Sequence, residues 1–237
     1  MRPTRATARA LATAALGVLL LPGLTACSGE DSVGEGRTPE QVMDLTKKTL
    51  DETSGVSITL ESDGLPDGVA GLSSGEGVGT HAPAFEGTIG VIVAGAPVDV
   101  PVVAVDGTVY ARLPFTFGWQ DIDPADYGAP DPATLMSTDS GFSSLLPATT
   151  DLEEGDSVRG GEDNKEVLTE YTGTVPGDVV SNVIPSAEGD FDATYSISSD
   201  GELRTAELTG VFYPDTEAMT YTIGFDDYGT EKDIVAP

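Results

Sequence analysis

Residues 88–113 read TIGVIVAGAPVDVPVVAVDGTVYARL, and this stretch decides the fold class. The segments 88–93, 97–105 and 108–113 are rich in β-branched residues, which favour extended backbone. An Asp106-Gly107 pair separates the last two segments, and this dipeptide is typical of a tight hairpin turn. Strand-like runs that follow one another at such short spacing predict an antiparallel meander.

The apolar side chains of these runs form sets that share one face of a strand, because successive side chains of a strand point to opposite faces. The sets are Ile89, Val91 and Val93, then Val98, Val100 and Val102, then Val109, Ala111 and Leu113, and the alternation continues in Phe115, Phe117 and Trp119. Two interpretations fit this pattern. The apolar face is either the packed core of a sandwich or the concave face of a curved sheet that encloses an apolar ligand.

Further strand-like segments lie on both sides of the meander. Residues 57–61 alternate before it, and the C-terminal half has alternating or apolar runs at 190–198, 202–213 and 218–225, with a turn at Asp200-Gly201. The sheet is therefore expected to be large and antiparallel.

Helices are expected at the start of this unit and between its strand-rich halves. Thr38 is a suitable N-cap, Pro39 fits the first helical position, and Gln41 completes a capping box, so a helix is predicted over 39–53. Shorter helices are predicted at 132–137, 140–146 and 176–183. No long stretch of 38–237 is low in apolar residues, so this region is expected to be one α+β domain.

Composition excludes several classes of function. The 237 residues include 11 Lys+Arg and 40 Asp+Glu, and the net charge is −29. A chain this acidic is repelled by nucleic-acid phosphates, so nucleic-acid binding is not expected. The single Cys excludes an intrachain disulfide framework and a Cys-cluster metal site.

The N-terminal residues are expected to be an export signal. Arg2, Arg5 and Arg9 precede an apolar run at 10–21 that is too short to span a bilayer comfortably. The run leads to Leu24-Thr25-Ala26-Cys27, which matches a bacterial lipobox and places the chain's only Cys at the position that is lipidated. Residues 1–26 are therefore predicted to be a lipoprotein signal peptide. Cys27 is predicted to anchor the protein on the extracytoplasmic face of the cell membrane, with 27–37 as a flexible tether.

A search for catalytic residues finds no complete set. Residues 71–75 formally match G-x-S-x-G, but glycines crowd 68–79 and fit a flexible or bulged segment better than the helix that a nucleophile elbow requires. His81 is the only His, and alone it cannot form a zinc site. The acidic loop 121–126 lacks EF-hand spacing. We therefore expect no enzyme activity, no metal and no cofactor.

The mature chain resembles the LppX/LprAFG lipoproteins of actinobacterial cell envelopes over roughly residues 38 to 237. The resemblance is carried by several short motifs in order, none of them catalytic: VDGTVYA at 105–111, Trp119 with DPADY at 123–127, Asp131-Pro132 ahead of Leu135, DSGFSSLL at 139–146, GTVP at 173–176 and DDYG at 226–229.

This resemblance implies a fold and a function. The implied fold is similar to LolA/LolB-type carriers: a strongly curved antiparallel half-barrel, covered by a few helices, that encloses an apolar cavity. The implied activity is binding and shuttling lipids with several acyl chains, such as triacylated glycolipids or triacylglycerol, in some members beside a major-facilitator-type exporter. Ile89, Val91 and Val93 align with a cavity-lining strand of the family. Val100, Val102 and Val109 are further candidates for the lining.

Two functions therefore remain open for this chain. One is a membrane-anchored lipid carrier, and the other is a non-transporting envelope lipoprotein that acts as an assembly or interaction partner of a membrane transporter. A cavity larger than the roughly 300–1,000 Å³ of ordinary ligand pockets would favour the carrier, and a fully packed core would exclude it.

Overall fold

The computed structural model of the protein describes residues 32–66, 68–69, 71–93, 95–127, 129–161 and 164–237. The predicted signal peptide and Cys27 lie outside the described residues. Residues 32–237 belong to one compact unit, which contains every helix and strand given below and its own hydrophobic core. This segment is therefore expected to fold independently of the residues before it.

The unit is built on one sheet of eleven strands in the order β6-β5-β4-β3-β2-β1-β11-β10-β9-β8-β7. Every neighbouring pair is antiparallel. The strands are β1 (Gly55–Ser62), β2 (Leu72–Thr80), β3 (Ala84–Val93), β4 (Ala96–Val105), β5 (Thr108–Ala111), β6 (Gln120–Ile122), β7 (Thr150–Gly160), β8 (Glu166–Val175), β9 (Glu188–Ser198), β10 (Leu203–Val211) and β11 (Met219–Asp226).

The order of the strands explains where the helices lie. Strands β1–β6 form one meander and β7–β11 another, and the first and last strands, β1 and β11, join them in the middle of the sheet. The chain must therefore travel from the edge at β6 to the opposite edge at β7. It does so through a crossover segment, residues 123–149, that contains η1 (Pro124–Tyr127), η2 (Pro132–Met136), η3 (Phe142–Ser144) and α2 (Leu145–Ala148).

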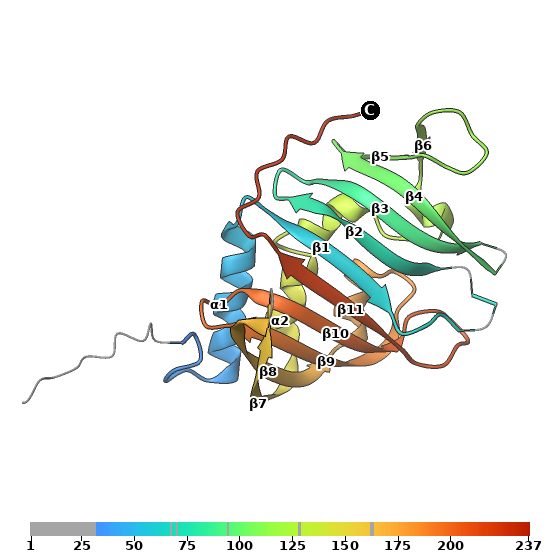
Figure 1. Ribbon diagram of the computed structural model, residues 1–237. Coiled ribbons are helices and arrows are strands. Elements are labelled where there is room, and N and C mark those ends of the chain that lie inside the picture. The colour runs from blue at the N-terminus through green and yellow to red at the C-terminus, as the bar shows by residue number, and fades with distance from the viewer. Residues whose placement is uncertain (1–31, 67, 70, 94, 128, 162–163) are drawn as a thin grey trace, which may run out of the picture. The chain divides into compact units, whose positions relative to one another are not determined.

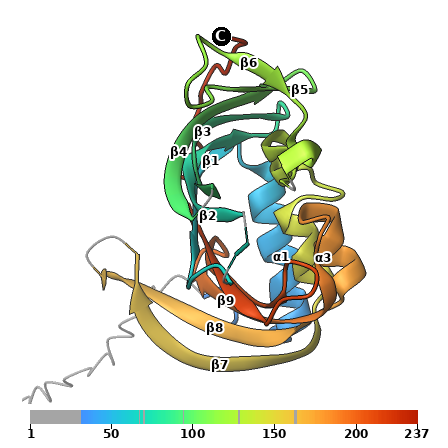
Figure 2. The same ribbon diagram turned by 90° about the vertical axis from the view of Figure 1, so that its right-hand side faces the viewer.

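The sheet is strongly curved, and the helices occupy its concave side (Figures 1 and 2). Helix α1 (Pro39–Glu52) packs against η3 and α2, and α3 (Gly177–Val183) packs against β9. The largest buried cluster joins side chains of α1, the crossover segment and α3 to the inner face of β1 and β8–β11. A second cluster lies on the inner face of β3–β5. The predicted α+β half-barrel covered by a few helices is therefore confirmed.

The local predictions for α1 and the hairpin turn are also met. The Thr38 backbone N–H donates to Gln41 Oε1 (3.0 Å), and the Gln41 N–H donates to Thr38 Oγ1 (3.5 Å), so the capping box is formed. Asp106 and Gly107 have φ values of 54° and 73°, which is the left-handed backbone of a two-residue hairpin turn. The meander predicted from residues 88–113 is β3–β5.

The structure differs in part from three local expectations. The glycine-rich segment is bulged only at the register shift between Leu72 and Ser74, and most of it is the regular strand β2. Phe115 and Phe117 do not continue a strand but lie in the exposed loop between β5 and β6, because Phe115 has left-handed backbone with φ 64°. Residues 32–37 are not wholly free tether, since the Val33 N–H donates to the Ser199 carbonyl (2.8 Å) and Val33 packs against the main core.

Candidate functional site

An apolar pocket lies between the concave face of the sheet and the helices that cover it. Its floor comes from β1–β3, β10 and β11, and its roof from the crossover segment and α3. The pocket holds about 90 Å³ of water-accessible space. The apolar side chains around it are Ile58, Leu60, Leu72, Phe85, Ile89, Leu208 and Ile223 from the sheet, and Pro130, Pro132, Leu135, Phe142, Leu145, Val180, Val183 and Ile184 from the cover.

Strand periodicity places the floor residues in the pocket. On β1, Ile58 and Leu60 face inward, and on β11 the inward set is Tyr221 and Ile223, because alternate side chains share a face. The register pairs Leu60 with Ile223 across the two strands, so the two halves of the sheet meet directly under the pocket. The floor is thus a continuous apolar surface across the junction of the two meanders.

Two tyrosines close one end of the pocket around the peptide of Leu72. The Tyr221 hydroxyl donates to the Leu72 carbonyl (2.6 Å), and the Leu72 N–H donates to the Tyr213 hydroxyl (3.1 Å). The two hydroxyls also share a hydrogen bond of 2.9 Å. Burial raises the pKa of Tyr221, and the hydrogen bond to Tyr213 raises it further, so this hydroxyl stays neutral. The group holds the start of β2 against β10 and β11 without placing a charge at the pocket.

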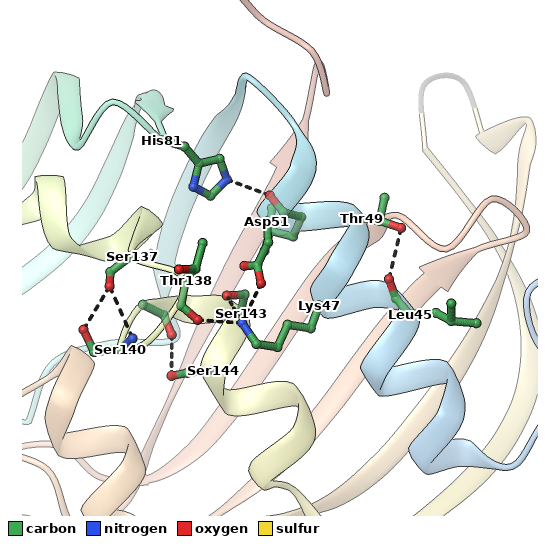
Figure 3. Close-up of polar contacts among 12 residues, drawn as sticks. Leu45, Lys47, Thr49, Asp51, His81, Ser137, Thr138, Ser140, Ser143 and Ser144 are labelled. Carbon is green, nitrogen blue, oxygen red and sulfur yellow. Dashed lines mark hydrogen bonds and ion pairs between the residues drawn. The ribbon is translucent and has the colours of Figure 1, made fainter.

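Polar contacts join the crossover segment to α1 (Figure 3). The Lys47 ammonium donates to Asp51 Oδ2 (2.6 Å), to the Thr138 carbonyl (2.6 Å) and to Ser143 Oγ (3.3 Å). Thr138 lies in the turn between η2 and η3, and Ser143 lies in η3. Lys47 therefore fastens the middle of the crossover segment to α1.

Residues 38–234 match the LppX_LprAFG lipoprotein family. The chain belongs to this family. LprF from Mycobacterium bovis has a similar structure, with a TM-score of 0.66 and 14% sequence identity over 84% of this chain and 96% of that one. The lipoprotein LppX from Mycobacterium tuberculosis gives a TM-score of 0.60 and 17% identity, over 83% of this chain and 97% of that one. At these identities, the structures establish a shared fold.

Weaker likenesses add nothing to this assignment. A LolA superfamily protein from Nitrosomonas europaea matches with a TM-score of 0.28 and 8% identity over 83% of this chain and 94% of that one, which is too low to establish a common architecture. No curated protein sequence matches the chain. Within the described residues, no helix is both long enough and apolar enough to cross a membrane.

The residues predicted to line a cavity lie in different places in this family member. Ile89 lines the pocket. Val91, Val100, Val102 and Val109 lie farther along the same face, in the second cluster. Their role in binding stays a prediction. Val93 is at the end of β3 and is 54% exposed, outside both the pocket and the cluster.

The pocket is much smaller than the cavity expected from the family resemblance. Ordinary ligand pockets are about 300–1,000 Å³, and a lipid with several acyl chains needs the upper part of that range or more. Phe85 belongs both to the pocket wall and to the second cluster, where Ala133 of η2 is also buried. The crossover segment therefore fills the space that an open half-barrel would leave empty. The interior is neither a large cavity nor fully packed.

Most lining residues were not found from the sequence. Strand periodicity identifies Ile58, Leu60 and Ile223 as members of an apolar face, but it does not say which part of a large sheet stays uncovered. Val180 and Leu135 lie on short helices that have no measurable periodicity of their own. The Tyr213–Tyr221 pair links β11 and the turn after β10 to the start of β2, and nothing in the sequence indicates this contact.

The candidate catalytic residues do not assemble into a site. The G-x-S-x-G match runs into strand β2, so it is not followed by the helix of a nucleophile elbow. His81 Nε2 lies 2.7 Å from the Leu50 carbonyl, where a ring N–H donates, and it is thus engaged by α1 (Figure 3). Among the described residues, no cluster of His, Cys, Asp and Glu is suitable for a metal ion.

Proposed function

We propose that the protein is a membrane-anchored, extracytoplasmic lipoprotein that binds lipids with several acyl chains and shuttles them across the actinobacterial cell envelope. Triacylated glycolipids and triacylglycerol are the lipid classes proposed. The observation that carries the proposal is the apolar pocket under the crossover segment, in a fold shared with LprF and the lipoprotein LppX.

Acyl chains are costly to expose to water. Each CH₂ group transferred out of water contributes about 0.8 kcal/mol, so exposing a sixteen-carbon chain costs on the order of 10 kcal/mol. A lipid that crosses an aqueous compartment therefore needs an apolar enclosure. The pocket lining supplies apolar surface on both floor and roof, and the polar groups at its closed end are already hydrogen-bonded to one another.

Binding requires the roof to move, because the pocket is too small as it stands. The pocket and the second cluster lie side by side on the concave face, and both are covered by η2 through Pro132, Ala133 and Leu135. An outward movement of η2 joins them into one apolar channel. The predicted residues Val91, Val100, Val102 and Val109 then become cavity lining together with Ile89.

Lipid extraction from purified protein tests the proposal. Residues 32–237 are expressed without the signal peptide, and bound lipid is extracted and identified by mass spectrometry. We expect multi-acyl lipid from the wild type and none from Ile89→Trp, since an indole at this position fills the pocket. Ile92→Trp is the matched control, because Ile92 lies on the same strand but on the opposite face, and it should retain the lipid.

One result decides against the carrier. A wild type that carries no lipid favours the non-transporting partner of a membrane transporter, for which an exporter of the major-facilitator type is the proposed associate. A folded Ile89→Trp variant with unchanged lipid contradicts the assignment of Ile89 to the binding site. Shuttling itself is tested by transfer of a fluorescent triacylglycerol between vesicles, which Ile89→Trp should abolish.

The membrane anchor is tested separately. Cys27→Ser removes the thiol that is proposed to be acylated. We expect the full-length wild type in the membrane fraction and the variant in the soluble extracytoplasmic fraction or as an uncleaved precursor. Cleaved, membrane-bound Cys27→Ser protein would contradict lipid anchoring at this residue.

A further inference from the structure

The loop between β5 and β6 exposes two aromatic rings completely. Phe115 is 106% exposed and Phe117 is 99% exposed, whereas every other large hydrophobic side chain of the described residues is at most 64% exposed. The loop projects at the β5–β6 edge of the sheet (Figure 1). A soluble domain gains no stability from rings that touch nothing, so these side chains point to a contact outside the domain.

The loop has a defined shape that presents the rings outward. Phe115 has a φ of 64° and Gly118 a φ of 71°. A left-handed backbone is uncommon for a bulky residue, and here it turns the side chain away from the sheet. Leu113 packs into the second cluster before the loop and Trp119 packs beside Ile234 after it, so both ends are fixed.

Three carbonyl groups of the loop have hydrogen-bond donors close by. The Leu113 carbonyl accepts from the Thr116 N–H (3.3 Å) and from Thr116 Oγ1 (2.9 Å). Gln120 Nε2 donates to the Phe117 carbonyl (3.1 Å) and to the Trp119 carbonyl (3.0 Å). Backbone groups that enter a lipid phase need internal partners, and this loop supplies them for three of its carbonyls.

The charge of the loop differs from that of the chain. From Gly107 to Gln120 there is no Asp or Glu, although the whole chain has a net charge of −29. The only charged residue of this stretch is Arg112, whose guanidinium lies 4.9 Å from the centre of the Trp119 ring. An acidic domain can therefore bring this loop to a lipid surface with the least electrostatic repulsion, and Arg112 is available to headgroup phosphates.

We propose that Phe115 and Phe117 insert into a lipid bilayer and dock the domain on the membrane with which it exchanges lipid. The proposal rests on the proposed function. The partner that fits this loop is a lipid bilayer. The exposed rings suit its apolar interior, the hydrogen-bonded carbonyls suit its polar interface, and Arg112 beside Trp119 suits its phosphate layer. Helix α1 lies away from the β5–β6 edge (Figure 1), so the loop lies apart from the first helix of the domain. We propose it as an attachment point in addition to Cys27.

Vesicle binding of residues 32–237 tests the proposal. Trp119 is the only tryptophan of the chain and lies beside the loop, so its fluorescence reports local insertion, and flotation of the vesicles reports binding. With phosphatidylcholine vesicles, we expect the wild type to float and its emission to shift to shorter wavelength. The double variant Phe115→Ser/Phe117→Ser should bind roughly a hundredfold more weakly, about tenfold for each ring. Because both rings are exposed, its thermal unfolding should match the wild type.

Controls separate this contact from other causes. Val167→Ser removes an exposed apolar side chain on β8, 48% exposed, and should leave binding unchanged. Vesicles with equal parts phosphatidylcholine and phosphatidylglycerol should bind less protein at low salt and recover with sodium chloride, because salt screens the repulsion between two anionic surfaces.

The outcomes distinguish this proposal from the carrier function. The double variant should still co-purify with lipid, and Ile89→Trp should still bind vesicles. Vesicle binding by a wild type that carries no lipid supports the docking loop and contradicts the carrier. A wild type that does not bind vesicles, or a double variant that binds equally well, overturns the docking proposal. If the wild type is a dimer that does not bind vesicles, and the double variant is a monomer, the docking proposal is overturned. The two rings then mediate contact between two copies of the chain.

Discussion

At the residue scale, glycines on β2 shape the inner face of the sheet. A Cβ atom added to Gly77 would lie 2.5 Å from Phe85 Cζ and 2.7 Å from the Glu86 carbonyl oxygen. The glycine therefore lets the Phe85 ring lie flat against the neighbouring strand, where it separates the pocket from the second cluster. Gly75, on the same face, has only Leu60 Cβ nearby, at 3.5 Å. Chain flexibility therefore does not explain these glycines. Gly77 is explained by the space that the Phe85 ring occupies.

This difference gives a paired prediction. Gly77→Ala should lower the free energy of unfolding by about 1–3 kcal/mol, because the backbone carbonyl of Glu86 cannot yield without disturbing the ladder between β2 and β3. Gly75→Ala should change it little or raise it by up to about 1 kcal/mol, since alanine restricts the unfolded chain. Urea unfolding of both variants measures the difference. Equal changes in the free energy of unfolding for the two variants would show that the packing of Phe85 does not require a glycine at position 77.

At the element scale, the crossover segment depends on Lys47 for its attachment to α1. Lys47→Met should remove the hydrogen bonds to Thr138 and Ser143 and leave Asp51 without its cation. Hydrogen bonds to charged groups contribute about 1.5–3 kcal/mol, so amide exchange in residues 137–144 should become roughly ten- to a hundredfold faster. Hydrogen exchange read by mass spectrometry checks this.

Lys48→Met is the matched control for this prediction. Lys48 is on the same helix, its side chain is 65% exposed, and its ion pair with Glu52 is long, at 3.8 Å. An exposed pair of this kind contributes little, so exchange in the crossover segment should not change. If both variants exchange alike, the segment is held by its apolar contacts, such as Met136 over Gly79, and not by Lys47.

The elements that sequence reasoning found are those with a local physical cause. Helix α1 has its capping box, and β3–β5 have β-branched residues around a left-handed Asp-Gly turn. Strand β7 was not found because it is exposed at most positions and its pairing with β8 shifts register twice, so no apolar alternation exists to detect. The pocket was predicted only in part for a related reason. Its floor follows strand periodicity, but its roof depends on where a chain with little regular structure crosses from β6 to β7.

At the scale of the whole molecule, acidic residues far outnumber basic ones. Removing the predicted signal peptide takes away Arg2, Arg5 and Arg9, which leaves 8 basic residues against the same 40 acidic ones, a balance of −32. Such a surface keeps a domain with an apolar interior soluble and standing off anionic lipid, except where the β5–β6 loop offers uncharged aromatic rings. The same surface opposes the compact state through self-repulsion.

Arg204 on β10 shows how few cations are available to pair with the carboxylates. Arg204 is 15% exposed, and its Nε and Nη2 atoms donate to Glu166 at 2.7 Å and 2.9 Å. It also lies 2.8 Å from Glu202 and 4.0 Å from Asp226. Burial alone would lower the pKa of Arg204, but the hydrogen bonds to Glu166 and the charges of Glu202 and Asp226 outweigh it and raise the pKa. Arg204 thus remains charged and holds carboxylates of three different segments together.

Salt should therefore stabilise this protein, although it weakens individual ion pairs. Sodium chloride shortens the screening length from about 10 Å at 0.1 M to about 3 Å at 1 M, which relieves the repulsion among carboxylates. The Tm of residues 32–237 should rise, by about 2–4 °C for each kcal/mol relieved in a domain of this size. Arg204→Gln leaves Glu166, Glu202 and Asp226 uncompensated, so its Tm should be lower at low salt and should rise more steeply. Calorimetry in chloride, not sulfate, isolates screening from the strengthening of apolar burial. A Tm that falls with sodium chloride would mean that paired charges such as those of Arg204, and not the excess of acidic ones, determine the electrostatic stability of the fold.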